Sequence, residues 1–387
     1  MRLREIFLKG FKSIDGEDGQ RIPLGDVTVL LGANGSGKSN LVAFFKMLNF
    51  MTTGALQQHI ARQGARSFLF YGPKKTESVS FELRFEAEEV LDVYAVQLSY
   101  GLPDRLFVSR EKVTYYRKDR SQPQKYDLAS GAPELALNQD SRTTSRVLYS
   151  LLSGIRTYQF HDTSDTAKIK DRGYVDDARY LRSDGGNLAA FLKMLKEHEA
   201  YARYYERIVR RIRRVMPQFG DFDLASIPGR EDYVRLNWRD ASDYDYLFDP
   251  DQISDGSLRF MALATLFLQP PELLPRLIVL DEPELGLHPA AITELAGIVR
   301  SASRKTQVLI ATQSMRLVDE FGLEELVVVE RDRERHCSLF RKLEAKRLHD
   351  WLERYSLSEL WEKNVLGGQP RSEEHTSELQ SPSSISY

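Results

Sequence analysis

The stretch "VTVLLGANGSGKSNLVAFFKML" (Val27 to Leu48) decides the fold. It opens with an apolar, β-branched run, which is typical of a buried strand. A glycine-containing turn follows it, and apolar residues then recur at helical spacing at Leu41, Phe44, Phe45 and Leu48. A buried strand, a tight turn and a helix in this order predict an α/β domain.

The turn "GANGSGKS" (Gly32 to Ser39) matches the phosphate-binding pattern G-x-x-x-x-G-K-[ST]. Gly35 and Gly37 allow backbone N–H groups to point inward at phosphate oxygens, and the helix N-terminus adds its positive end. We expect Lys38 to contact the β and γ phosphates and the Ser39 hydroxyl to bind Mg²⁺. ATP and Mg²⁺ are the expected cofactors, with an ATP-binding set of Gly32, Asn34, Gly35, Ser36, Gly37, Lys38, Ser39 and Asn40.

A second apolar strand, "RLIVLDEPE", runs from Arg276 to Glu284 and ends in acids. Burying two carboxylates at a strand end is costly unless they serve a metal or a proton. We expect Asp281 to hold Mg²⁺, directly or through water, and Glu282 to orient the water that attacks ATP. The alternative is a surface strand end with two solvated acids.

The motif "SDGSLR" (Ser254 to Arg259) precedes a predicted buried helix. Ser254 or Asp255 would cap this helix, and Gly256 would leave its backbone open to a ligand. Arg259 lies in the first turn, where a positive charge is unfavourable for an isolated helix. A nearby phosphate or carboxylate would relieve that cost. An Asp-Gly turn into a core helix explains the capping equally well but does not explain Arg259.

Composition restricts the function classes. A net charge of −2 excludes binding of nucleic acid by the whole surface, so any DNA contact needs a local basic patch. The single cysteine, Cys337, excludes a disulfide framework and a multi-thiolate metal site and fits a reducing compartment. The longest uncharged apolar run, "FMALATLFL", is too short to span a bilayer. We therefore expect a soluble, cytoplasmic protein that has no contact with a membrane.

The 387 residues predict several subdomains. We expect an N-terminal lobe at 1–150 with the P-loop and an antiparallel β subdomain, a mainly helical insertion at 151–250, and a C-terminal lobe at 251–370. A last helix is predicted at 345–355. The segment 371–387 begins with "RSEEHTSELQS", which resembles a translated sequencing adapter, so we expect a non-native tail. A disordered natural tail is the alternative.

One predicted helix of the insertion is strongly basic. It carries six arginines, at Arg203, Arg207, Arg210, Arg211, Arg213 and Arg214. Such a face could follow a phosphate backbone. A solvated helix surface is the preferred interpretation.

The order of the motifs along the chain resembles that of the ABC-type ATPase heads of the SMC and RecF-like branch, including the overcoming-lysogenization-defect proteins. The resemblance rests on "LKGFKSI", "GKSNL", "SDGSLRFMALATLFL", "DEPELGLHP" and "ATQS". It covers the chain from Met1 to about Pro370 and is weakest from 50 to 250. It implies a P-loop NTPase of the α/β class, whose mixed, partly parallel sheet is flanked by helices.

The resemblance also implies roles for single residues. Ser254, Asp255 and Gly256 fall at the signature loop, which contacts the γ-phosphate of ATP bound to the other subunit. Residues 284–289 fall at the D-loop, which crosses the dimer interface. Gln313 takes the switch position, where many relatives have histidine; glutamine can donate a hydrogen bond but cannot titrate. Gln159 in "TYQFHD" is the candidate Q-loop glutamine and Mg²⁺ ligand, with an exposed strand residue as the alternative.

We therefore expect an ATPase that forms a homodimer around ATP and acts in DNA repair, DNA maintenance or phage defence, with double-stranded DNA as an expected partner. The alternative is a regulatory ATPase subunit that controls a separate effector protein, such as a nuclease or toxin. A transporter ATP-binding subunit is a weaker alternative, because no aromatic-rich adenine loop is evident and the P-loop lies close to the N-terminus.

Overall fold

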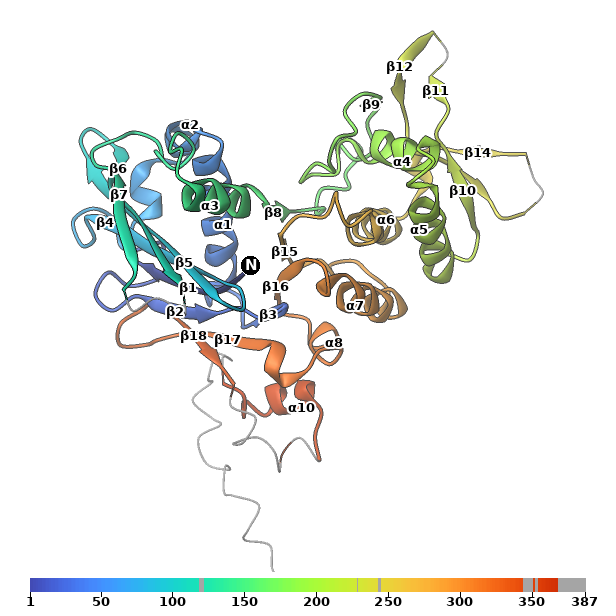
Figure 1. The fold of residues 1–387 in the computed structure, drawn as a ribbon. Coiled ribbons are helices and arrows are strands. Elements are labelled where there is room, and N and C mark those ends of the chain that lie inside the picture. Colours follow the sequence, from blue (N-terminus) through green and yellow to red (C-terminus); the bar gives the residue numbers. More distant parts are fainter. Residues whose placement is uncertain (118–121, 228, 243–244, 344–350, 352–353, 368–387) are drawn as a thin grey trace, which may run out of the picture.

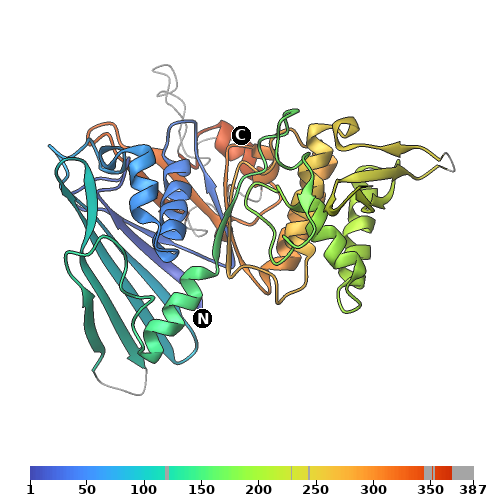
Figure 2. The same cartoon turned by 90° about the horizontal axis from the view of Figure 1, so that it is seen from above.

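The computed structural model describes residues 1–117, 122–227, 229–242, 245–343, 351 and 354–367. Three regions lie side by side in Figure 1: an antiparallel sheet at the N-terminal end, a central sheet, and a group of helices and short strands at the far end. Figure 2 shows the same order from above, so the N-terminal sheet and the far group lie on opposite sides of the central sheet.

The central sheet has the order β18-β17-β3-β16-β15-β8. Its parallel strands are β3 (Val27–Leu31), β8 (Ile155–Tyr158), β15 (Leu277–Asp281), β16 (Gln307–Thr312) and β17 (Leu326–Arg331). The edge strand β18 (Ser338–Lys342) is antiparallel to β17. Strands β3, β15, β16 and β17 carry largely apolar, buried runs because both faces of the sheet are covered by other elements.

Alternate side chains of β3 enter two different cores. Val27, Val29 and Leu31 pack with helices α6 (Asp255–Leu268) and α7 (Pro289–Ser303) on one face. Leu30 packs on the other face with α1 (Lys38–Thr52) and the N-terminal sheet. The P-loop at the end of β3 is therefore fixed between two cores.

The N-terminal sheet is antiparallel and has the order β2-β1-β4-β5-β6-β7. Its strands are β1 (Arg2–Lys9), β2 (Gln20–Pro23), β4 (Ser78–Glu86), β5 (Val90–Gly101), β6 (Arg105–Arg117) and β7 (Gln124–Ala129). Its buried face meets α1 through edge contacts of Phe44 with Phe11 and Phe81. Three further short helices belong to this region: α2 (Leu56–Gln63), η1 (Ala65–Phe68) and α3 (Thr143–Ser153).

The segment 151–250 contributes β8 to the central sheet and builds most of the far group. It contains helices α4 (Leu188–Glu197) and α5 (Ala202–Val215), and η2 (Pro250–Gln252) begins at its end. Its short strands form two small sheets: β10 (Phe219–Asp223), β13 (Asn237–Asp240) and β14 (Leu247–Phe248), and β9 (Gly173–Tyr174), β11 (Ser226–Ile227) and β12 (Arg230–Val234). The segment thus combines strands with helices, and the predicted lobe boundaries stay a prediction.

The C-terminal part adds α8 (Met315–Val318), η3 (Leu323–Glu325) and α10 (Leu357–Glu362). The helix predicted at 345–355 falls largely outside the described residues, and the predicted tail at 371–387 lies entirely outside them. Within the described residues, no helix is both long and apolar enough to cross a membrane.

Candidate functional site

The P-loop connects β3 to α1 through two glycines with positive φ, Gly35 at 77° and Gly37 at 112°. A Cβ on Gly37 would lie 2.0 Å from Ser338 Oγ, and one on Gly32 would lie 2.3 Å from the carbonyl oxygen of Val329. Gly35 has nothing within 4 Å of its Cβ position, so only its backbone conformation requires glycine there. The hairpin β17–β18 therefore packs directly behind the loop.

Two serines that the sequence analysis missed hold the loop from behind. Ser338 Oγ donates to the carbonyl of Ser36 at 2.6 Å and lies 2.7 Å from Ser13 Oγ. Asn40, a member of the expected ATP-binding set, donates its side-chain amide to Ser13 Oγ at 2.7 Å. Ser13 lies in "LKGFKSI", so its closeness to the P-loop in sequence was a usable signal. Ser338 gave none, because its contact depends on the folding back of β18.

Lys38 is 5% exposed and turns its ammonium group back onto the loop. Its Nζ donates to the carbonyls of Gly32 at 2.5 Å and Ala33 at 3.0 Å. Burial lowers the pKa of Lys38, and the nearby carboxylates of Glu282, Asp281 and Glu284 oppose that shift. A cation fixed in a loop of inward-facing backbone groups can bind a phosphate.

The P-loop lies next to the acidic end of β15, although 242 positions separate Ser39 from Asp281. Ser39 Oγ donates to Asp281 Oδ1 at 3.4 Å. Burial raises the pKa of Asp281, and the Ser39 hydrogen bond opposes this shift. A hydroxyl and a carboxylate are the oxygen ligands that Mg²⁺ prefers. Among the described residues there is no metal-binding group of three or more His, Cys, Asp or Glu, so Mg²⁺ here would need phosphate or water oxygens as further ligands.

Glu282 has a backbone conformation that is rare outside glycine, with φ of 41°. Its N–H donates to the carbonyl of Ala311 at 2.7 Å, which fixes the turn against the end of β16. Strain of this kind costs about 1–3 kcal/mol and concentrates at functional sites. The surrounding structure therefore holds the backbone of Glu282 in an unfavourable conformation, which is typical of a functional residue.

Glu284 is a further buried acid that the sequence analysis did not single out. It is 7% exposed and accepts a hydrogen bond from the Thr312 hydroxyl. The Thr312 hydroxyl in turn accepts from the N–H of Ser314 at 2.9 Å. Burial raises the pKa of Glu284. The exposed Gln313 thus lies between Thr312 and Ser314, which are connected by hydrogen bonds to Glu284.

The predicted signature loop begins helix α6. Ser254 is its N-cap, and Ser254 Oγ accepts from the N–H of Ser257 at 3.2 Å. A Cβ on Gly256 would lie 2.3 Å from the carbonyl oxygen of Gly286. The segment 284–289 of the same chain therefore packs against one side of Gly256, which is partly exposed, and the expectation that this backbone is open to a ligand stays a prediction.

Arg259 is 5% exposed and points into its own subunit. Its Nε donates to the carbonyl of Phe160 at 2.9 Å, and one terminal nitrogen donates to that of His161 at 3.1 Å. Burial lowers the pKa of Arg259, and Asp255 opposes the shift. The direct hydrogen-bond partners of Arg259 are therefore two backbone carbonyls, and the nearby Asp255 carboxylate favours its charge, as expected of a nearby acid.

Gln159 follows β8 directly and is exposed, with its N–H donating to the carbonyl of Ser183 at 2.9 Å. Because β8 and β15 are parallel neighbours, Gln159 lies at the same edge of the sheet as Asp281. Two residues later, His161 Nε2 lies 2.6 Å from the carbonyl oxygen of Asp281. His161 was missed, since a lone histidine gives no signal by itself. The roles of Gln159 and Gln313 stay predictions.

The arginines of α5 are largely engaged within the chain. Arg211 and Arg214 both pair with Glu294 of α7, and Arg207 donates to Ser301 Oγ at 3.2 Å. Arg213 donates to the carbonyl of Gly220 at 2.9 Å. These contacts attach α5 to α7 and β10, which favours the structural interpretation of this helix over a nucleic-acid surface.

Comparison with known proteins identifies the family. A family model described as "AAA domain, putative AbiEii toxin, Type IV TA system" matches residues 27–319. The chain belongs to this AAA-domain family. No curated protein matches the chain.

Solved structures confirm the fold of this AAA-domain protein. An Smc head bound to the C-winged helix domain of ScpA has a TM-score of 0.55 and 16% identity, over 90% of this chain and 100% of that chain. An Smc head with an extended coiled coil, bound to the C-terminal domain of ScpA derived from Pyrococcus furiosus, has a TM-score of 0.54 and 17% identity. That match covers 91% of this chain and 98% of the other. The chain therefore has the P-loop NTPase fold of an SMC-type ATPase head, as the motif order predicted.

Proposed function

We propose that this protein binds ATP with Mg²⁺, hydrolyses it to ADP and phosphate, and forms a homodimer around the nucleotide. The convergence of Lys38, Ser39, Asp281 and Glu282 at the ends of β3 and β15 is the observation that carries the proposal. Membership of an AAA-domain family supports it.

Each of the four converging residues has a proposed role in ATP binding or hydrolysis. The Lys38 ammonium group would give up its hydrogen bonds to two loop carbonyls and bind phosphate oxygens instead, whose negative charge compensates its own. Ser39 and Asp281 would hold Mg²⁺, which neutralises charge on the transferred phosphoryl group. Glu282 would orient the attacking water, because its strained backbone fixes its position at the end of β15.

The dimer proposal rests on the signature loop. Ser254 and Asp255 lie at the N-terminus of α6, where backbone N–H groups and the helix dipole favour an anion. In the proposed dimer this terminus approaches the γ-phosphate held by the partner subunit. ATP would then drive association because it binds the closed dimer more tightly than the open head.

Glu282→Gln tests the proposal. Since the amide keeps the side chain's size but loses the base, the variant should bind ATP, hydrolyse it at least a hundredfold more slowly, and elute as a dimer with ATP on size-exclusion chromatography. Lys38→Ala is the control and should lose ATP binding in calorimetry. Elution of Glu282→Gln as a monomer at saturating ATP would contradict the dimer model, and unchanged ATP affinity of Lys38→Ala would contradict the P-loop assignment.

A second function is favoured by the family's description, which names a toxin and a type IV toxin–antitoxin system. In this case the ATPase would regulate a separate effector protein in the cytoplasm. Co-purification of an effector encoded beside the gene, with release that depends on ATP, would support it. ATPase activity stimulated by double-stranded DNA in the isolated protein would support action on DNA in repair, maintenance or phage defence instead.

A further inference from the structure

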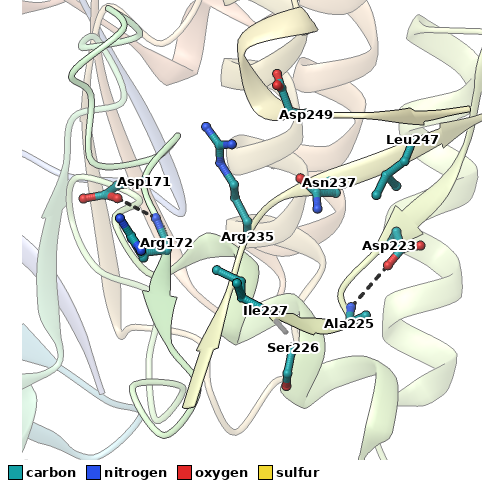
Figure 3. A pocket seen from close by; sticks show the side chains of 10 residues that line it. All are labelled: Asp171, Arg172, Asp223, Ala225, Ser226, Ile227, Arg235, Asn237, Leu247 and Asp249. Atoms are coloured by element: carbon teal, nitrogen blue, oxygen red, sulfur yellow. Dashed lines mark hydrogen bonds between the residues drawn. The ribbon is translucent and has the colours of Figure 1, made fainter. Parts of the chain in front are cut away.

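Several hollows in the described part of the chain lie outside the nucleotide site, and two of them are lined by both acidic and basic side chains. The larger, about 740 Å³, lies among the small sheets of the far group, and Figure 3 shows three aspartates and two arginines on its wall. Several of these charges are paired internally: Asp223 binds Arg239 at 2.8 Å, and Arg235 binds Asp251 at 3.0 Å. This hollow has no excess of positive charge to attract an anionic ligand.

The second hollow, about 430 Å³, is lined by Lys46, Asn49, Phe50 and Thr53 at the C-terminal end of α1, by residues 156–158 of β8 and by residues 180–184. We call it the α1–β8 groove. Its charged lining consists of Lys46, Arg156 and Arg182 with a single acid, Asp184. Cations from three separate segments therefore converge on one concave surface.

The positive charge of the α1–β8 groove persists when the neighbouring ion pairs are included. Arg182 pairs with Asp177 at 2.8 Å, and Asp184 pairs with Lys168 at 3.0 Å. Each of these pairs is neutral in sum. Lys46, which is exposed, and Arg156 provide the remaining positive charge.

An aromatic ring accompanies these cations. Tyr180 is 53% exposed, and the Arg156 guanidinium lies 5.4 Å from the centre of its ring. Single exposed rings also occur elsewhere on this chain, for example Tyr71 at 57%, so the significance of Tyr180 comes from the cations beside it. Cations combined with an exposed aromatic ring are typical of surfaces that bind single-stranded nucleic acid, where phosphates meet the cations and bases stack on the ring.

We propose that the α1–β8 groove binds a single-stranded nucleic acid. Lys46 and Arg156 contact its phosphates, and a base stacks on Tyr180. A duplex fits this surface less well, because its bases are already stacked on each other and only its phosphates could be used.

The groove is connected to the candidate catalytic centre. Its floor strand β8 continues into Gln159, whose N–H donates to Ser183 of the groove wall at 2.9 Å. The same segment reaches the Asp281 carbonyl through His161 at 2.6 Å. A strand bound in the groove would therefore alter ATP hydrolysis. This consequence rests on the proposed ATPase function, whereas binding in the groove does not.

Binding is tested first, without ATP, by fluorescence anisotropy of a labelled single-stranded oligothymidine. Lys46→Glu should weaken binding at least tenfold, and Tyr180→Leu should weaken it severalfold by removing the stacking surface. Arg210→Glu, which reverses an exposed arginine on α5, is the matched control and should bind as the unchanged protein does. Equal weakening by Arg210→Glu, or unchanged binding by Lys46→Glu, would overturn the groove assignment.

Salt dependence gives a second readout. For single strands the log–log slope of affinity against salt is about 0.7 per phosphate contact, so the two cations Lys46 and Arg156 predict a slope of about 1.4. Lys46→Gln should lower it by about 0.7. Tighter binding of a duplex of equal length would contradict the single-strand proposal. Oligonucleotide-stimulated ATP hydrolysis that Lys46→Glu abolishes would support the coupling; binding without stimulation would leave the groove valid and remove the coupling alone.

Discussion

At the scale of single residues, Asp92 on β5 is a buried acid away from the proposed site. It is 2% exposed, and its Oδ1 is among the buried atoms without a hydrogen-bond partner in the described structure. Burial raises the pKa of Asp92 to about 6 from 3.8. The folded protein therefore binds this proton more tightly than the unfolded chain does, so the free energy of unfolding falls as the pH rises from about 4 to 6.

Asp92→Asn should remove this penalty. At pH 7.5 we expect the free energy of unfolding to increase by about 1–3 kcal/mol, since one pKa unit corresponds to about 1.4 kcal/mol. At pH 4, where Asp92 is protonated in the folded state, the variant and the original should be about equally stable. Urea unfolding at both pH values measures this difference. A variant that is less stable at pH 7.5 would show that the carboxylate has a stabilising partner.

The sequence predicted the residues of the candidate site better than their surroundings. Lys38, Ser39, Asp281 and Glu282 belong to short motifs, so their types and spacing were visible in the sequence. Arg259 was noticed for its unfavourable position, yet its partners are backbone carbonyls that the sequence does not mark. Backbone groups carry no residue identity, and for that reason such contacts could not be anticipated.

At the scale of elements, the strand, turn and helix around the P-loop were predictable because their signals are local. The residues that support them from other segments were less predictable, because Ser338 and Glu284 act through contacts with residues far away in the sequence. The insertion showed the same limit. Its two amphipathic helices were predicted, while its two- to five-residue strands are too short for a clear alternation of apolar residues.

The contact between the start of α6 and the D-loop yields a prediction at this scale. Gly256→Ala places a methyl group 2.3 Å from the Gly286 carbonyl oxygen, and backbone on both sides must move to admit it. We expect a loss of about 1–3 kcal/mol in the free energy of unfolding and a loss of ATP hydrolysis of at least tenfold.

Gly297→Ala in α7 is the matched control, because no atom lies within 4 Å of its Cβ position. It should gain up to about 1 kcal/mol, since alanine favours a helix over glycine, with unchanged hydrolysis. Thermal unfolding and a phosphate-release assay measure both effects. Full activity of Gly256→Ala would show that the two segments move apart easily and that their contact does not position the signature loop.

At the scale of the whole molecule, the dimer proposal assigns each ATP site to two chains. The P-loop and acids come from one chain and the signature loop from the other, so defects on opposite sides of the site should complement each other. Lys38→Ala removes the nucleotide site of a chain and leaves its signature loop intact. Ser254→Arg blocks the signature loop and leaves the nucleotide site intact. Each variant alone should be inactive, because every site in its homodimer carries a defect.

An equal mixture of the two variants should regain activity. About half of the randomly formed dimers are mixed, and each of these has one intact site out of two, which predicts about a quarter of the original rate of hydrolysis. Mixing Lys38→Ala with Glu282→Gln is the control: both defects lie on the same side of the site, so no intact site can form. A phosphate-release assay over a range of mixing ratios measures the recovery. If Lys38→Ala and Ser254→Arg stay inactive together although the mixed dimer forms with ATP, the signature loop does not complete the partner's site, and the helix that Ser254 caps serves its own chain alone.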